Sequence, residues 1–241
     1  AYSQKEEAVL ERKEWNGQQG TTVWYFQEGN KETASPLILC LAASEEEAQT
    51  CEKILTSQAE SAALGVILVP GGDMASWEEN VADLVYDLQQ KEGLDQARFT
   101  LTGTVTCSSG VWQLASHFPQ WFAGVCVVGG YAEPYEARAL KDVPLLVCAP
   151  AQEDTQIRNG KVYAGGEVTA MGLRVAGARY LDMPEGYQEL APQQAWEKAF
   201  SQEGGAVRWL LAQDRRVQFM VEWIKPGVWR IDDFFSASCY L

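Results

Sequence analysis

The chain has 241 residues, 46% of them hydrophobic, and a formal net charge of −14 at pH 7. This length and apolar content predict one α/β domain with a large core. The acidic charge predicts that neither nucleic acid nor an anionic membrane surface is a partner, since both attract basic patches, and no apolar run reaches the roughly 18 residues of a membrane span.

Six cysteines lie at positions 40, 51, 107, 126, 148 and 239, and no two of them have C-x-x-C spacing. Cys40, Cys126 and Cys148 lie inside apolar, strand-like runs. This pattern is typical of buried free thiols in a reduced compartment, so we expect a cytoplasmic protein. The spacing of metal-binding thiolates is missing, and we predict neither a metal nor a cofactor.

The chain begins with a polar stretch over 1–20, which we predict to be an N-terminal arm, frayed or helical. The β-branched and aromatic run at 22–27 and the apolar run at 36–41 predict two strands. Ser44, with Glu47 three residues later, has the pattern of a capping box and predicts the start of a helix.

A further strand is predicted at 65–70, and a second capping box at Ser76 and Glu79 predicts the next helix, which ends at Gly93. A short β-favouring run at 99–101 follows.

Beyond it, a helical apolar stripe stops at Pro119, and the almost unbroken apolar run at 122–128 predicts a strand buried on both faces. Another buried strand is predicted at 144–148, then a polar, irregular stretch at 152–166. The remaining elements are a weak helix at 167–176, a strand at 178–183 and helices at 193–200 and 206–213. Strands that alternate with helices in this way predict a doubly wound, mostly parallel sheet with helices on both faces.

The stretch from Arg98 to Gly130 reads as strand, sharp turn, helix and strand, which is the context of a nucleophile elbow. The feruloyl and acetyl-xylan esterases and polyhydroxybutyrate depolymerases of the α/β-hydrolase family have roughly Leu-Thr-Gly-x-Ser-x-Gly-Gly-x-Gly-x-Trp there, then a helix ending in an aromatic residue and proline. The chain resembles this pattern at Leu101, Thr102, Gly103, Gly110, Trp112, Phe118 and Pro119. The resemblance covers residues 21–215 and implies an α/β-hydrolase fold.

The same alignment places Val105 at the nucleophilic serine, and a valine side chain has no lone pair with which to attack. Cys107 and Ser108 stand where two glycines belong. Either of them is an alternative, relocated nucleophile, although that register moves the turn three residues into the helix and loses the match at Trp112. Because the family's nucleophile has a positive φ, which is costly for a β-branched residue, we predict that the turn at Val105 is relaxed.

Tyr187 stands where the resemblance places the catalytic histidine. The chain's one histidine, His117, follows Val105 by about 18 Å of helix at 1.5 Å per residue, so we expect it to be a surface or packing residue. Glu153 or Asp154 matches the position of the acid. The resemblance therefore implies a carboxylate whose histidine partner is missing.

The resemblance places one donor of the oxyanion hole after the strand at 36–41, where Ala42 and Ala43 replace a His-Gly pair. These donors are backbone N–H groups, so the side-chain changes do not delete them. We predict that the N–H groups of Thr106 and of a residue near Ala43 converge in a vestigial hole that binds a carbonyl or an anion without turnover. The predicted pocket is lined by Ala42, Ala43, Thr104, Val105, Thr106, Cys107, Ser108, Glu153 and Tyr187.

The last stretch, 217–241, alternates like paired strands around a turn at Pro226-Gly227. It resembles the opening of a metallo-β-lactamase-fold domain, where a Pro-Gly-Val-Trp-Arg-Ile-Asp strand turns into one that begins Ser-Cys-Tyr-Leu. This resemblance implies the start of a following domain, and the alternative is a terminal hairpin packed on the sheet edge.

We therefore expect an arm at 1–20, an α/β-hydrolase-like domain at 21–216 and a β extension at 217–241. The expected function is that of a catalytically inactive, pseudo-esterase domain that binds an acyl- or carbohydrate-like small molecule or a protein, a second copy included. It is expected to be the N-terminal domain of a larger hydrolase. The alternatives are an active esterase-type hydrolase that uses Cys107 or Ser108, and a purely structural domain with a filled pocket.

Overall fold

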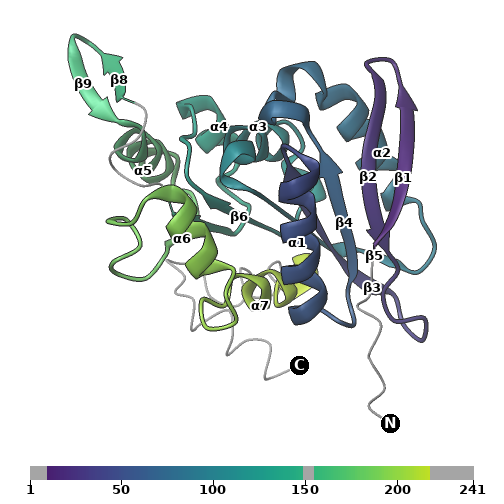
Figure 1. Ribbon diagram of the computed structural model, residues 1–241. Helices are drawn as coiled ribbons and strands as arrows, with labels where there is room; N and C mark the ends of the chain where they lie inside the picture. Colours follow the sequence, from purple (N-terminus) through teal and green to yellow (C-terminus); the bar gives the residue numbers. More distant parts are fainter. Residues whose placement is uncertain (1–9, 149–154, 218–241) are drawn as a thin grey trace.

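The computed structural model describes residues 10–148 and 155–217, and it is built around a sheet of eight strands (Figure 1). The strands lie in the order β1-β2-β4-β3-β5-β6-β7-β10. Their bounds are β1 Glu11–Gly17, β2 Gly20–Gln27, β3 Ser35–Ala42, β4 Ala63–Leu68, β5 Leu94–Gly103, β6 Gly124–Val128, β7 Leu145–Cys148 and β10 Tyr180–Asp182. From β4 to β10 neighbouring strands pair in parallel, which confirms the predicted fold class.

Helices cover both faces of the sheet. On one face lie α1 Glu45–Gln58, α6 Pro192–Ala199 and α7 Ala206–Leu211, and on the other lie α2 Glu78–Gln89, α3 Ser108–His117, α4 Pro134–Ala139 and α5 Gly165–Ala176. The central strand β3 explains the two layers, because Leu37 and Leu39 belong to one apolar cluster whereas Ile38 and Cys40 belong to the other. A strand buried on both faces needs such an unbroken apolar run.

The N-terminal prediction is wrong for residues 11–17, which form the edge strand β1 and pair antiparallel with β2. Lys13 and Trp15 are half-buried, and the alternate residues Arg12 and Glu14 face solvent. Charged residues on one face are typical of an edge strand that avoids pairing with other chains. Residues 1–9 lie outside the described part.

The start of α2 is not capped as predicted. Trp77 is the N-cap residue, and the hydroxyl of Ser76 donates instead to Asp73 at 2.6 Å. The N–H of Glu79 donates to the side-chain oxygen of Gln19, 3.0 Å away in the turn between β1 and β2. The acceptor at this helix end therefore comes from a distant segment, which replaces the local capping box.

Asn80 ties α2 to the β1–β2 hairpin. Its buried amide donates to the Gly20 carbonyl at 2.8 Å and to the Thr22 hydroxyl at 3.1 Å, and accepts from the Gln19 N–H at 3.1 Å. We expect Asn80→Ala to lower the free energy of unfolding by about 2–3 kcal/mol, because these partly buried groups lose their partner. Urea denaturation measures the change. The exposed Asn16→Ala should cost less than about 0.5 kcal/mol, and equal losses for the two variants would contradict the role given to Asn80.

Residues 155–164 form a hairpin, β8 Thr155–Arg158 and β9 Lys161–Ala164, as a separate two-stranded sheet. The prediction of an irregular stretch is wrong here. The turn is Asn159-Gly160, with φ of 51° and 74°, and two positive φ values are what a type I′ turn requires. In Figure 1 the hairpin stands away from the body of the molecule, next to α5.

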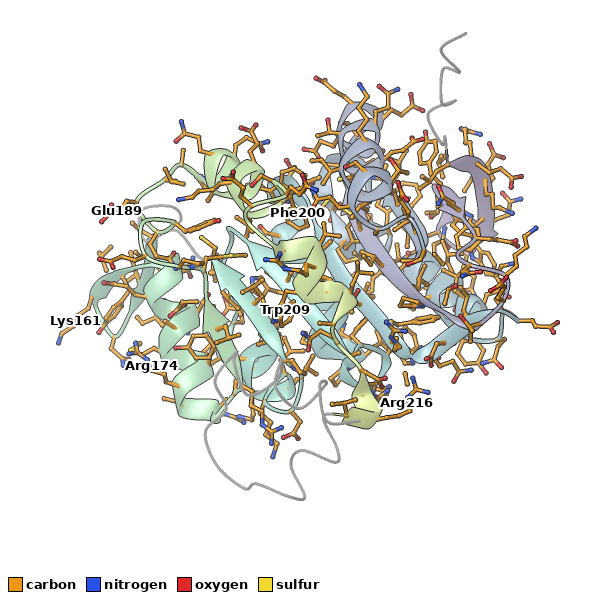
Figure 2. The ribbon with its side chains drawn as sticks, turned by 90° about the horizontal axis from the view of Figure 1, so that it is seen from below. Lys161, Arg174, Glu189, Phe200, Trp209 and Arg216 are labelled. Carbon is orange, nitrogen blue, oxygen red and sulfur yellow. The ribbon has the colours of Figure 1, made fainter. Side chains whose placement is uncertain are left out.

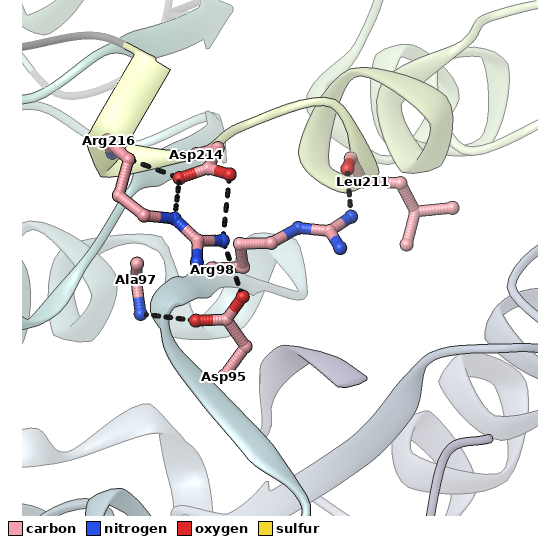
Figure 3. Close-up of polar contacts among 6 residues, drawn as sticks. All are labelled: Asp95, Ala97, Arg98, Leu211, Asp214 and Arg216. Atoms are coloured by element: carbon pink, nitrogen blue, oxygen red, sulfur yellow. Dashed lines mark hydrogen bonds and ion pairs between the residues drawn. The ribbon is translucent and has the colours of Figure 1, made fainter. Parts of the chain in front are cut away.

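The described chain ends beside the start of β5. The guanidinium of Arg216 bridges Asp95 at 2.6 Å and Asp214 at 3.0 Å (Figure 3). Burial alone would raise the pKa of Asp214, but the hydrogen bonds from Arg216 outweigh it and lower that pKa. Beyond Val217 the predicted β extension lies outside the described residues.

Candidate functional site

The turn after β5 has the predicted strand–turn–helix shape. β5 ends at Gly103, a short 3-10 helix spans Val105–Cys107, and α3 follows at once. A Cβ atom on Gly103 would lie 2.7 Å from Val111 Cγ2 and 3.4 Å from Cys107 Cβ, so only glycine lets α3 approach the strand this closely. The indole N–H of Trp196 on α6 donates to the Gly103 carbonyl at 2.9 Å and fixes the turn from the other side.

Val105 is an apolar packing residue at the place where the resemblance puts the nucleophile. Its side chain is half-buried, and its Cγ1 lies close to Gly129, 3.4 Å from where a Cβ atom of that glycine would be. Asn159 is the one non-glycine residue with a positive φ in the described ranges, so Val105 does not have the strained backbone of a nucleophile. The predicted relaxation of this turn is confirmed.

The carboxylate of Glu47, in the first turn of α1, lies across the position of the oxyanion hole. One of its oxygens accepts from the Ala43 N–H at 2.8 Å and from the Thr104 hydroxyl at 2.6 Å, and the other accepts from the Thr106 hydroxyl at 2.8 Å. The Ser44 side chain caps the helix as predicted by accepting from the Glu47 N–H at 3.2 Å. Glu47 itself does not complete a capping box but joins the start of α1 to the turn after β5.

This arrangement corrects the expected anion site. The N–H of Ala43 is already bonded to a carboxylate, and a second anion placed there would meet a like charge. The loop after β4 closes in as well, because a Cβ atom on Gly72 would lie 2.3 Å from the Thr106 carbonyl oxygen. Three of the predicted residues, Ala43, Thr104 and Thr106, are therefore brought together, but around a side chain of the chain itself.

The other predicted residues that the structure describes do not gather into one open pocket. Ala42 is fully buried in the sheet. Tyr187 is only 4% exposed and packs in the apolar cluster with α6, where the ammonium of Lys198 lies 4.4 Å from its ring centroid. Burial, and to a smaller extent Cys148, raises the pKa of Tyr187. Glu153 and Asp154 lie outside the described residues.

His117 is the last residue of α3, whereas Val105 precedes its first turn. Its Nδ1 lies 2.5 Å from the carboxylate of Glu78 on α2, and its side chain is 43% exposed. The prediction that it is a surface residue remote from the turn is confirmed.

Within ranges 10–148 and 155–217, neither alternative nucleophile has an activating base. Cys107 is 1% exposed, and burial raises the pKa of its thiol to about 12, so at neutral pH it is not the reactive thiolate. The Ser108 hydroxyl is directed at Gly130, where a Cβ atom would lie 2.5 Å from it. Neither residue has the imidazole partner of an activated nucleophile, since His117 is bonded to Glu78 at the far end of α3.

The cysteines, metal-binding side chains and helix lengths were checked over the described residues. Cys40, Cys51, Cys107, Cys126 and Cys148 are free and buried, as predicted. In ranges 10–148 and 155–217, His, Cys, Asp and Glu side chains form no cluster of three that would hold a metal ion. Each helix in these ranges lacks the length or the apolar character for a membrane span.

Comparison with known proteins identifies solved structures that have a similar fold. No protein-family model matches the sequence, and no curated protein matches it. Among solved structures, a thermostable esterase superposes with a TM-score of 0.64 at 17% identity, over 86% of this chain, which spans 63% of that esterase. An esterase from Pyrobaculum calidifontis superposes with a TM-score of 0.55 at 13% identity, over 84% of this chain and 86% of the other.

A fluorophosphonate-binding serine hydrolase from Staphylococcus aureus, FphF, superposes with a TM-score of 0.59 at 12% identity, over 84% of this chain and 98% of the other. Likeness at these identities carries the fold and not the activity. Together with the strand order and the turn after β5, it shows that this chain has the α/β-hydrolase fold.

Proposed function

We propose that this chain is a catalytically inactive, pseudo-esterase domain with an α/β-hydrolase fold, and that it serves as a ligand-binding or interaction module, as one part of a larger hydrolase. The proposal rests above all on the place of His117, which is bonded to Glu78 at the far end of α3. Acyl transfer on this fold needs a base that takes the proton of the nucleophile. Among the described residues of the turn after β5, no hydroxyl or thiol is bonded to an imidazole, and the hydroxyls of Thr104 and Thr106 donate to the carboxylate of Glu47 instead.

Two further observations support the loss of activity. The nucleophile's position is taken by Val105, an apolar residue with relaxed backbone. One of the two donors expected to stabilise a tetrahedral oxyanion, the Ala43 N–H, is bonded to Glu47. Losing one such donor costs an active enzyme about 10²–10³ in kcat.

A cavity of about 440 Å³ supports the ligand-binding part of the proposal. It lies where β7 and β10 end, and its lining includes Tyr163, Arg174, Tyr180, Asp182 and Gln188. Burial raises the pKa of Asp182, and Arg174 partly offsets the shift. Ligands of doubly wound sheets bind outside the carboxyl ends of the strands, and a few convergent polar groups in such a cavity suit the acyl- or carbohydrate-like ligand that we propose.

Labelling with a fluorophosphonate probe tests the inactivity. This reagent phosphonylates activated serines, and the S. aureus protein FphF, named for binding it, is the positive control. We expect the intact chain to gain no stoichiometric adduct in a mass spectrum under conditions that label FphF fully. An adduct that maps to Ser108 or Cys107 and disappears in Ser108→Ala or Cys107→Ala would overturn the proposal.

A further inference from the structure

The β8–β9 hairpin has an uncovered apolar face. Its register pairs Ile157 with Val162, so both side chains lie on one face of the two-stranded sheet, and they are 76% and 65% exposed. A hairpin of two strands is marginally stable in water by itself, and neighbouring exposed aliphatic side chains are typical of surfaces that bind a protein. One face of the hairpin is therefore available to a partner.

The tip of the same hairpin is positively charged, although the whole chain has a net charge of −14. Lys161 follows the Asn-Gly turn and forms no ion pair within the described residues. Figure 2 shows it at the outer edge of the molecule, directed away from the body. Arg158, its partner in the register, is held by Glu133 at 2.7 Å. Lys161 is thus the cation that a partner meets, and its complement is an acidic surface.

A groove of about 450 Å³ between α2 and the end of α3 has the complementary chemistry. Tyr86, Phe118 and Trp121 line its apolar part, and the rings of Phe118 and Trp121 stack with centroids 4.1 Å apart. Glu79 and Asp83 are exposed at its rim, and within the described ranges their carboxylates have no hydrogen bond or ion pair. Among the described residues, the lining contains no lysine or arginine.

We propose that this chain associates head to tail with further copies of itself, the β8–β9 hairpin of one copy occupying the α2–α3 groove of the next. Ile157 and Val162 would bury their side chains against the aromatic residues of the groove. Lys161 would lie beside Glu79 and Asp83. The groove volume is within the range of about 300–1,000 Å³ in which proteins enclose small groups, and opposite charges at the rim orient the two surfaces.

The two surfaces lie at opposite edges of the sheet, so a copy cannot fill its own groove. α2 packs against β1 and β2, and Gln19 from their turn lines the groove. The hairpin stands beside α5 (Figure 1). Leu173 and Arg174 of α5 line one cavity with Tyr180 and Asp182 of the edge strand β10. Contact between two different surfaces is heterologous and produces a ring or an open chain. It involves neither Val105 nor Glu47, so it is independent of the proposed loss of catalysis.

Sedimentation velocity of the full chain from micromolar to submillimolar concentration tests the contact. We expect the average mass to rise above the 26.7 kDa of one chain as the concentration increases. Lys161→Glu and Glu79→Lys should each weaken association by roughly tenfold, and the double variant should regain most of the loss because the charge pair is re-formed in reverse. Lys53→Glu, the same charge change on the exposed face of α1, is the matched control.

Three results would overturn the proposal. The first is a wild-type chain that stays at the mass of one copy throughout. The second is self-association that Glu79→Lys leaves unchanged, since a contact between two hairpins would be insensitive to the groove. The third is a double variant that associates no more strongly than the weaker of the two single variants. Circular dichroism of each variant separates a lost contact from a lost fold.

Discussion

Replacing Glu47 with alanine is expected to lower the free energy of unfolding by about 3 kcal/mol, because one carboxylate holds three donors from two segments. The Ala43 N–H and the hydroxyls of Thr104 and Thr106 all lose their acceptor. Of these, Thr104 is 6% exposed, so water replaces the lost bond poorly. Thermal or urea unfolding followed by circular dichroism measures the change.

Glu46→Ala is the matched control for this prediction. Glu46 precedes Glu47 in the same first turn of α1 and is exposed, so its removal causes the same loss of helix-dipole stabilisation, about 0.3–1 kcal/mol. Glu47→Gln keeps one acceptor and should fall between the two. If Glu47→Ala and Glu46→Ala unfold at the same denaturant concentration, the carboxylate does not hold the turn.

Replacing Gly72 with alanine is expected to cost about 3–4 kcal/mol, the largest loss that we predict for a single methyl group. Its φ is +73°, and the added Cβ atom would lie 2.3 Å from the Thr106 carbonyl oxygen, a backbone atom that cannot move without opening the turn after β5. The positive φ accounts for about 1–2 kcal/mol and the forced displacement for about 1–3 kcal/mol.

The neighbouring Gly71 separates these two contributions. It also has a positive φ, +65°, but nothing lies within 4 Å of the place that an added methyl group would take. Gly71→Ala should therefore cost only the backbone term, and the difference between the two variants measures how tightly the loop packs on the turn. Equal denaturation midpoints for the two alanine variants would show that the loop after β4 does not pack tightly on the turn after β5.

The apolar strands and most helices were predictable because their patterns are local. β3 reads as one apolar run since both faces are buried, and α1 begins at Glu45, directly after the predicted cap Ser44. The hairpin at 155–164 was predictable too, from the Asn159-Gly160 pair, but the polar composition around it hid that signal. The edge strand β1 was missed because four of its seven residues are charged and Trp15 alone gives no apolar alternation.

The site was predictable only in part. The positions of Val105 and Tyr187 in the hydrolase pattern were recognised from the sequence alone. The role of Glu47 was not, because its pattern indicates a helix cap, and its actual partners Thr104 and Thr106 lie 57 and 59 residues away. The capping prediction for α2 failed for the same reason, since the N–H of Glu79 donates to Gln19, 60 residues earlier. Contacts between segments that are distant in the sequence produce no local motif from which they could be predicted.

Hydrolysis of p-nitrophenyl acetate by the full chain decides whether the domain is catalytically inactive. We predict no burst of nitrophenol. We also predict a second-order rate constant that equals that of the Cys107→Ala/Ser108→Ala variant and lies far below the kcat/KM of ~10⁴–10⁸ M⁻¹s⁻¹ typical of enzymes. Two results would contradict the proposed inactivity. One is a burst equal to the protein concentration, and the other is a kcat/KM in the enzyme range for the wild-type chain but not for the folded double variant.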